Sequence, residues 1–170
     1  MTTQTPGRKV AYLSLCTAAA AICSYIETLI PITILPLPGF KLGLANIVLL
    51  LILTQTGLRD ALAVCLLRTV IVSLLFSGIL SLAFSLCGGI CALCVMAALQ
   101  KANKFSLPGI SVAGAVFHNL GQLLVAGIIT GSVSVLAYLP ALMLCALLCG
   151  LLMGFLAAMI ISLVQKSKLF

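Results

Sequence analysis

Acidic residues are almost absent from this chain of 170 residues, which contains only two carboxylates, Glu27 and Asp60. It also has a single histidine, His118, and no tryptophan. Hydrolytic, metal-dependent and phosphoryl-transfer sites commonly use clusters of Asp, Glu or His. A prenyl-transferring site of the aspartate-rich kind needs several carboxylates to hold magnesium against a diphosphate. We therefore expect that this chain is not an enzyme acting by itself.

Charge of either sign is scarce, because 6% of the residues are charged while 64% are hydrophobic. A soluble domain is about one quarter charged and about half apolar. A short chain cannot bury this much apolar surface, so the composition excludes a soluble globular protein and also a disordered one. The net charge is +7, but the nine basic residues are dispersed, which argues against nucleic-acid binding. The composition predicts an integral membrane protein in the lipid bilayer.

The eight cysteines all lie within apolar runs, which excludes a secreted disulfide framework. Cys87, Cys91 and Cys94 share one helical face, and Cys145 and Cys149 are spaced i, i+4. These thiols could ligate a metal or an iron–sulfur cluster, or they could serve as small apolar residues in helix packing. Polar partners are absent around the first three, which favours packing. We expect no metal and no cofactor.

Apolar runs of about 20 residues predict an all-α fold with six transmembrane helices. The predicted spans are 10–30, 41–55, 58–76, 79–99, 107–129 and 135–164. A proline-rich linker, 31–40, follows the first span, and the sixth is long enough to tilt or break near Gly150 and Gly154. We expect one transmembrane domain, 10–165, between tails at 1–9 and 166–170. The first run is longer than the apolar part of a signal peptide, so an uncleaved helix is expected.

The basic residues predict the orientation of these spans. Seven of them fall on one side of the six-span arrangement: Arg8, Lys9, Arg59, Lys101, Lys104, Lys166 and Lys168. Only Lys41 falls on the opposite side. The positive-inside rule then places both termini in the cytoplasm, in a multi-pass protein of the cytoplasmic (inner) membrane.

Polar side chains inside a bilayer are costly, so each is a candidate for function. The candidate ligand-binding residues are Glu27, Lys41, Asn46, Arg68, His118, Asn119 and Gln122. At about 1.5 Å per helical residue, the first three lie near the outer face, beneath the proline-rich linker. The other four lie near the midplane and would form the floor of the same pocket.

Each of these residues also has a structural interpretation. Glu27 and Lys41 could sit in interfacial water, Asn46 and Gln122 could join helices by hydrogen bonds, and His118 could be a neutral core residue. Arg68 has no acid in its own helix at i±3 or i±4. It must therefore pair across helices, bond to carbonyl groups or hold an anion.

The first predicted span also carries a stretch of small residues, Ser14, Ala18, Ala19 and Ala20. Small residues let helix backbones approach closely in a membrane. The stretch could dock onto a helix of another membrane protein, or it could pack against the other spans of this chain. The sequence leaves both alternatives open.

Several of these residues belong to longer segments of the sequence that form recognisable motifs. They are Pro38-Gly39-Phe40-Lys41-Leu42-Gly43-Leu44-Ala45-Asn46, Arg68, Cys87-Gly88-Gly89 and Gly114-Ala115-Val116-Phe117-His118-Asn119-Leu120-Gly121-Gln122. They resemble the pattern of the Gx transporter family, also called heptaprenyl diphosphate synthase component I. The resemblance covers about residues 10 to 165, and its two long motifs are specific. Phe117 departs from the pattern, where the family usually has a smaller residue.

The resemblance implies a six-helix bundle similar to the S components of energy-coupling factor (ECF) transporters. Such a subunit binds a small metabolite near the outer face and docks its first span onto a membrane coupling subunit driven by ATPases. This chain has no phosphate-binding loop of its own. Relatives are often encoded beside flavin-binding and quinone-synthesis proteins. The alternative is therefore a non-catalytic membrane partner in a prenyl- or quinone-synthesis complex, or in a flavin-linked electron-transfer complex.

Overall fold

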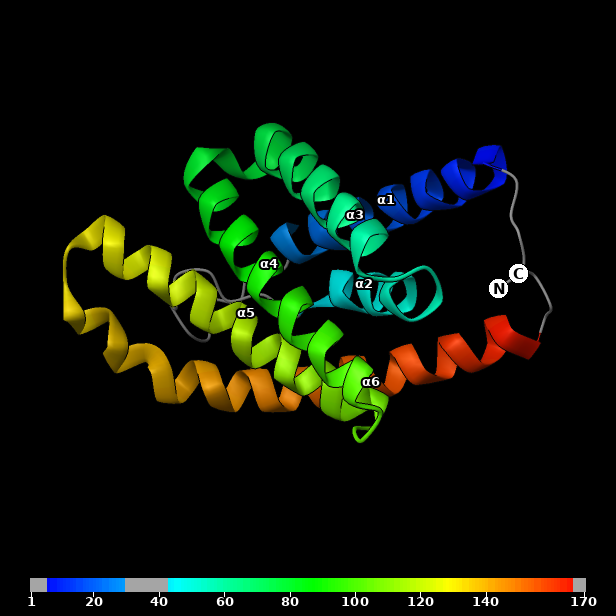
Figure 1. Cartoon of the computed structure of the whole chain (residues 1–170). Coiled ribbons are helices and arrows are strands. Elements are labelled where there is room, and N and C mark those ends of the chain that lie inside the picture. The colour runs from blue at the N-terminus through cyan, green and yellow to red at the C-terminus, as the bar shows by residue number, and fades with distance from the viewer. Residues whose placement is uncertain (1–5, 30–42, 167–170) are drawn as a thin grey trace.

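The computed structural model describes residues 6–29 and 43–166, and these ranges contain helices and no strand. The helices are α1 (Pro6–Leu29), α2 (Leu44–Gln55), α3 (Leu58–Val72), the π-helical turn η1 (Ser73–Ser77), α4 (Gly78–Ala102), α5 (Leu107–Thr130), the 3₁₀ helix η2 (Val133–Tyr138) and α6 (Leu139–Lys166). The predicted all-α fold is confirmed for these ranges (Figure 1). Lys41 and the proline-rich linker, 31–40, lie outside the described residues.

Four described segments are long and apolar enough to cross a membrane: 6–29, 58–102, 107–130 and 133–164. The segment 58–102 is interrupted by η1 and by Gly78, whose φ of 79° favours glycine. The interruption falls between the predicted spans 58–76 and 79–99, and α4 runs back from there toward α5 (Figure 1). Leu74, Leu75 and Ile79 are exposed around this turn. The helices therefore support a membrane-embedded protein, while the count of six spans stays a prediction.

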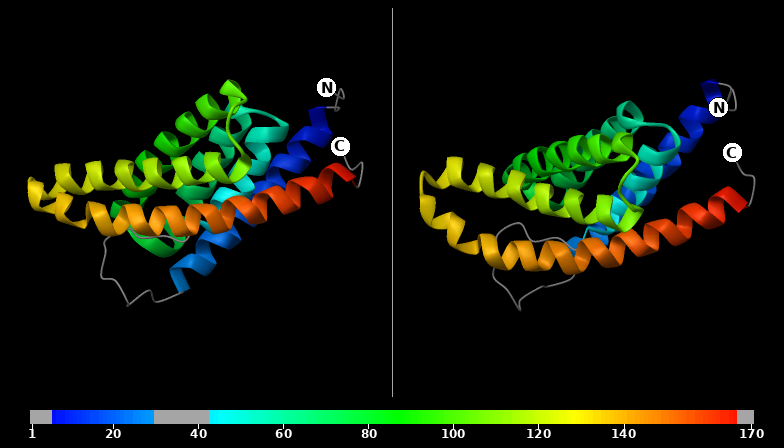
Figure 2. Two further views of the ribbon diagram at one scale, coloured as in Figure 1. Left: turned by 90° about the horizontal axis from the view of Figure 1, so that it is seen from below. Right: turned by 60° about the horizontal axis from the view of Figure 1, so that its bottom comes forward.

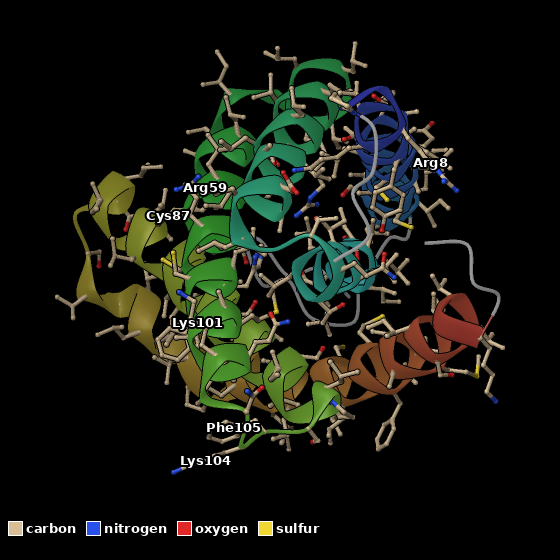
Figure 3. The ribbon with its side chains drawn as sticks, turned by 45° about the vertical axis from the view of Figure 1, so that its right-hand side comes forward. Arg8, Arg59, Cys87, Lys101, Lys104 and Phe105 are labelled. Carbon is tan, nitrogen blue, oxygen red and sulfur yellow. The ribbon has the colours of Figure 1, made fainter. Side chains whose placement is uncertain are left out.

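The start of α1 and the end of α6 lie at the same end of the molecule. The turn from α5 through η2 into α6 lies at the opposite end (Figures 1 and 2). The side chains of Arg59 in α3, Lys101 in α4 and Lys104 in the connection between α4 and α5 point outward (Figure 3). This arrangement agrees with the pattern of basic residues, but the cytoplasmic location of both ends stays a prediction.

The last predicted span differs from the structure in two ways. Its first residues form η2, and α6 begins only at Leu139. Helix α6 also continues without a break through Gly150 and Gly154. A Cβ atom on Gly150 would lie 2.8 Å from the Cα of Val112, and one on Gly154 would lie 2.5 Å from the Cα of Pro108. The two glycines therefore let α6 pack closely on α5. Of the two alternatives expected near them, a tilt or a break, the break does not occur.

Helices α4, α5 and α6 form what we call the second helix group. Helix α5 lies between the other two and makes the most extensive helix contacts of the described chain with them. Its contact with α4 is close because two glycines face each other: a Cβ on Gly121 would lie 2.9 Å from the Cα of Gly88. These contacts leave little room for α5 to move relative to its neighbours.

Helices α1, α2 and α3 form the first helix group, which polar contacts tie together near the start of α1. The hydroxyl of Tyr12 donates to Oε1 of Gln55 at 2.9 Å, joining α1 to α2. The Nζ of Lys9 lies 2.9 Å from Oδ2 of Asp60, joining α1 to α3. A shared apolar core connects the two groups, and its largest fully buried members include Leu49, Leu50, Ile52, Leu93 and Met96.

Candidate functional site

A polar cavity of about 30 Å³ lies where α1, α2, α3, α5 and α6 meet. It is lined by Glu27, Gly43, Ala45, Asn46, Arg68, Ala115, His118, Asn119, Cys145, Ala146 and Cys149. The structure thus brings together five of the seven predicted ligand-binding residues, from both predicted depths. The cavity has room for about one or two water molecules, so a larger ligand can enter only if lining groups move.

Glu27 lies in the last turn of α1, and its carboxylate is buried against the start of α2. The backbone N–H of Leu44 donates to Oε1 of Glu27. Helix α2 needs this oxygen, because its N-cap residue is Gly43, with a φ of 85° and no side chain to cap the helix. The partial positive charge at a helix N-terminus also stabilises a carboxylate. These contacts explain how an acid is held in an apolar bundle.

Arg68 lies in α3 and is only 6% exposed. Its Nη1 donates to Oγ of Ser24 in α1 at 2.6 Å, while its Nε has no hydrogen-bond partner among the described residues. Of the three alternatives left open for Arg68, the structure shows a contact with another helix, and the partner there is a neutral hydroxyl group. A neutral hydroxyl compensates a buried cation only in part, because it carries no opposite charge.

His118 and Asn119 reach the cavity from α5. Nδ2 of Asn119 donates to the carbonyl oxygen of Leu142 in α6 at 3.0 Å, which fixes the amide. His118 is buried beside Gly88 of α4, where an added Cβ would lie 3.1 Å from its Cε1 and 2.8 Å from its carbonyl oxygen. The glycine on α4 therefore provides the space in which His118 lies.

Two predicted ligand-binding residues are not placed in this cavity. Gln122 is buried, but it does not line the cavity. It lies next to α4, where a Cβ on Gly88 would lie 3.1 Å from its Cγ. Its Nε2 has no hydrogen-bond partner in the described part of the chain. Lys41 lies outside the described residues, so its predicted position is not tested.

The small residues predicted as a docking surface on α1 are divided between its faces. Ser14 and Ala18 are exposed, and Ala19 is partly buried. Ala20 is fully buried and belongs to the apolar core. Ala20 therefore contributes to internal packing, and Ser14 and Ala18 remain available to a partner.

The sequence reasoning missed Ser24, Cys145 and Cys149 as neighbours of the site. Ser24 precedes Glu27 by three residues, which places both on one face of a helix, and this spacing was the available signal. Cys145 and Cys149 line the cavity from α6. Their i, i+4 spacing indicated a shared face but not which helix that face contacts.

The other thiol face lies on α4, with Cys94 exposed and Cys87 and Cys91 partly buried. In Figure 3, Cys87 lies toward the outside of the helix bundle. Within residues 6–29 and 43–166, His, Cys, Asp and Glu form no group of three or more that could hold a metal ion.

Comparison with protein families gives one decisive result. The family model described as heptaprenyl diphosphate synthase component I matches residues 16–160. The chain belongs to this family. The matched range includes all seven predicted ligand-binding residues and every residue that lines the cavity. Comparison with curated proteins and with solved structures gives no match.

Proposed function

We propose that this chain is a membrane-embedded subunit that binds a small metabolite in the polar cavity, as the S component of an ECF-type transporter does. The observation that carries the proposal is the convergence of five polar side chains, two of them charged, from four helices on one cavity. Such a group is costly within a bilayer, and buried ionisable residues of membrane proteins commonly mark ligand or ion pathways. Arg68 bonds to the hydroxyl of Ser24 and to no carboxylate of the described residues, so it is the residue best placed to recognise the ligand.

In this proposal the energy for transport comes from partner proteins. The chain has no phosphate-binding loop, so a membrane coupling subunit and its ATPases would supply ATP hydrolysis. Ser14 and Ala18 on the exposed side of α1 would contact the coupling subunit. The protein would lie in the cytoplasmic membrane with both termini inside.

The second candidate function is a non-catalytic membrane partner of a prenyl diphosphate synthase, and family membership favours it. The two carboxylates support an accessory role over a catalytic one. Glu27 accepts a hydrogen bond from the start of α2, and Asp60 pairs with Lys9 elsewhere in the structure. They therefore do not form the paired set of acids that would hold magnesium against a diphosphate. A synthase component II would then be the partner.

Native mass spectrometry of protein purified gently from its own membrane tests the proposal. Two arginines of α3 provide a matched comparison, because Arg68 lines the cavity and Arg59 is exposed. We expect the unaltered protein and Arg59→Ala to retain the same small molecule, and Arg68→Ala to lose it while remaining folded. Equal retention by folded Arg68→Ala would refute the role of this residue. An empty protein that carries a stable prenyl-synthesis partner would instead favour the second function.

A further inference from the structure

The cavity contains two features that attract an anion, and the first is the N-terminus of α2. Gly43, Ala45 and Asn46, at the start of this helix of 12 residues, line the cavity. Unpaired N–H groups and the helix dipole make such an end a binding place for negative charge. In the present structure the carboxylate of Glu27 occupies it through the N–H of Leu44.

The second feature is the guanidinium of Arg68. This side chain is more than nine-tenths buried, lines the same cavity and has an Nε without a hydrogen-bond partner in the described ranges. A guanidinium offers several N–H donors in a fixed plane, which suits the two oxygens of a carboxylate or phosphate. The hydroxyl of Ser24 accepts a hydrogen bond from Nη1 alone. The arginine therefore retains capacity for an oxyanion.

We propose that the carboxylate of Glu27 is an internal stand-in for an anionic group of the ligand, a carboxylate or a phosphate. The ligand's oxyanion takes the place of the Glu27 carboxylate at the N-terminus of α2 and pairs with Arg68. Displacement is required for two reasons: two anions side by side repel, and a cavity of about 30 Å³ is too small for an added oxyanion. The inference rests on the proposed function, because it specifies the ligand of that site.

The neutral variant Glu27→Gln tests the displacement. Gln keeps an oxygen that can accept from Leu44, so it preserves the cap while removing the repelling charge. The matched control is Asp60→Asn, which removes the chain's other carboxylate, outside the cavity. Inorganic phosphate serves as the probe, with thermal stabilisation of the purified full chain measured at constant ionic strength. We expect Glu27→Gln to bind phosphate about tenfold more tightly than the unaltered protein, and Asp60→Asn to bind like the unaltered protein.

A measurement on the unaltered protein covers the case in which Glu27→Gln does not fold. Cys149 lines the cavity, whereas Cys94 is exposed on α4. Bound phosphate should slow the alkylation of Cys149 by N-ethylmaleimide and leave that of Cys94 unchanged. Equal phosphate affinity in Glu27→Gln and Asp60→Asn would overturn the inference, as would alkylation of Cys149 that is independent of phosphate.

The outcome for the ligand itself separates this inference from the proposed function. A retained metabolite without any anionic group would overturn the stand-in role of Glu27 and leave the binding function in place. A retained carboxylate or phosphate compound would support both. A protein that retains no metabolite and shows no response to phosphate would overturn both.

Discussion

The contact between α4 and α5 can be tested with a single methyl group at Gly121. The added Cβ of Gly121→Ala would lie 2.9 Å from the Cα of Gly88 and 3.0 Å from the carbonyl oxygen of Cys87. Both obstacles are backbone atoms, so no rotation of a side chain can relieve the overlap. The two helices must separate, and overpacking of this kind costs about 1–3 kcal/mol.

Two other glycines of α5 provide controls for this prediction. Gly127 has no atom within 4 Å of its Cβ position, so Gly127→Ala should be neutral or slightly stabilising. At Gly114 the obstacle is Sδ of Met96, at 2.6 Å. A methionine side chain is flexible, so Gly114→Ala should cost less than Gly121→Ala.

The difference in stability between these variants is measured by thermal unfolding in one detergent. The signal is the loss of monodisperse protein with rising temperature. For a chain of this size about 1 kcal/mol corresponds to roughly 2–4 °C in Tm, so we expect Gly121→Ala to lie several degrees below Gly127→Ala. Equal Tm values for these two variants would refute the close approach of α4 and α5. An unchanged Tm for Gly114→Ala would instead support the distinction between backbone and side-chain obstacles.

Two hydrogen bonds between helices give further predictions. Asn119→Leu removes the donor to the carbonyl of Leu142. We expect it to lower the free energy of unfolding by about 0.6 to 1.7 kcal/mol. A Tm equal to that of the unaltered protein would contradict this prediction. Tyr12→Phe removes the hydroxyl that donates to Gln55 and should cost about 0.5–1.5 kcal/mol, with a smaller loss when Gln55 has already been replaced by leucine. A full loss from Tyr12→Phe in that background would show that the hydrogen bond is not its cause.

The helices could be predicted from the sequence because each one depends on a local run of apolar residues and on the helix-breaking residues at its ends. The interruption at Ser77 and Gly78, the short α2 and the end of α5 near Gly131 all follow from residue types within a few positions. The continuity of α6 did not follow in this way. Gly150 faces Val112 of α5, and only the packed structure shows that it serves this contact.

The candidate site was predictable as a set of residues but not as a set of contacts. Glu27, Arg68 and His118 are candidates whatever their partners are, because burying an ionisable side chain in a bilayer costs free energy. Their partners depend on how helices rotate against one another, and periodicity along one helix does not determine that rotation. For this reason Ser24 was missed as the neighbour of Arg68, and Gln122 was placed in a cavity that it does not line.

The cavity lies on the boundary between the two helix groups. Glu27, Asn46 and Arg68 belong to the first group, while His118 and Asn119 belong to the second. The glycine contacts hold the second group together, and polar contacts near the start of α1 hold the first. Under the proposed function, a molecule bound at this boundary would contact both groups at once and would hold them together. Occupancy should be detectable from outside as slower relative motion of the two halves, and a second protein that contacts α1 could sense it without touching the bound molecule.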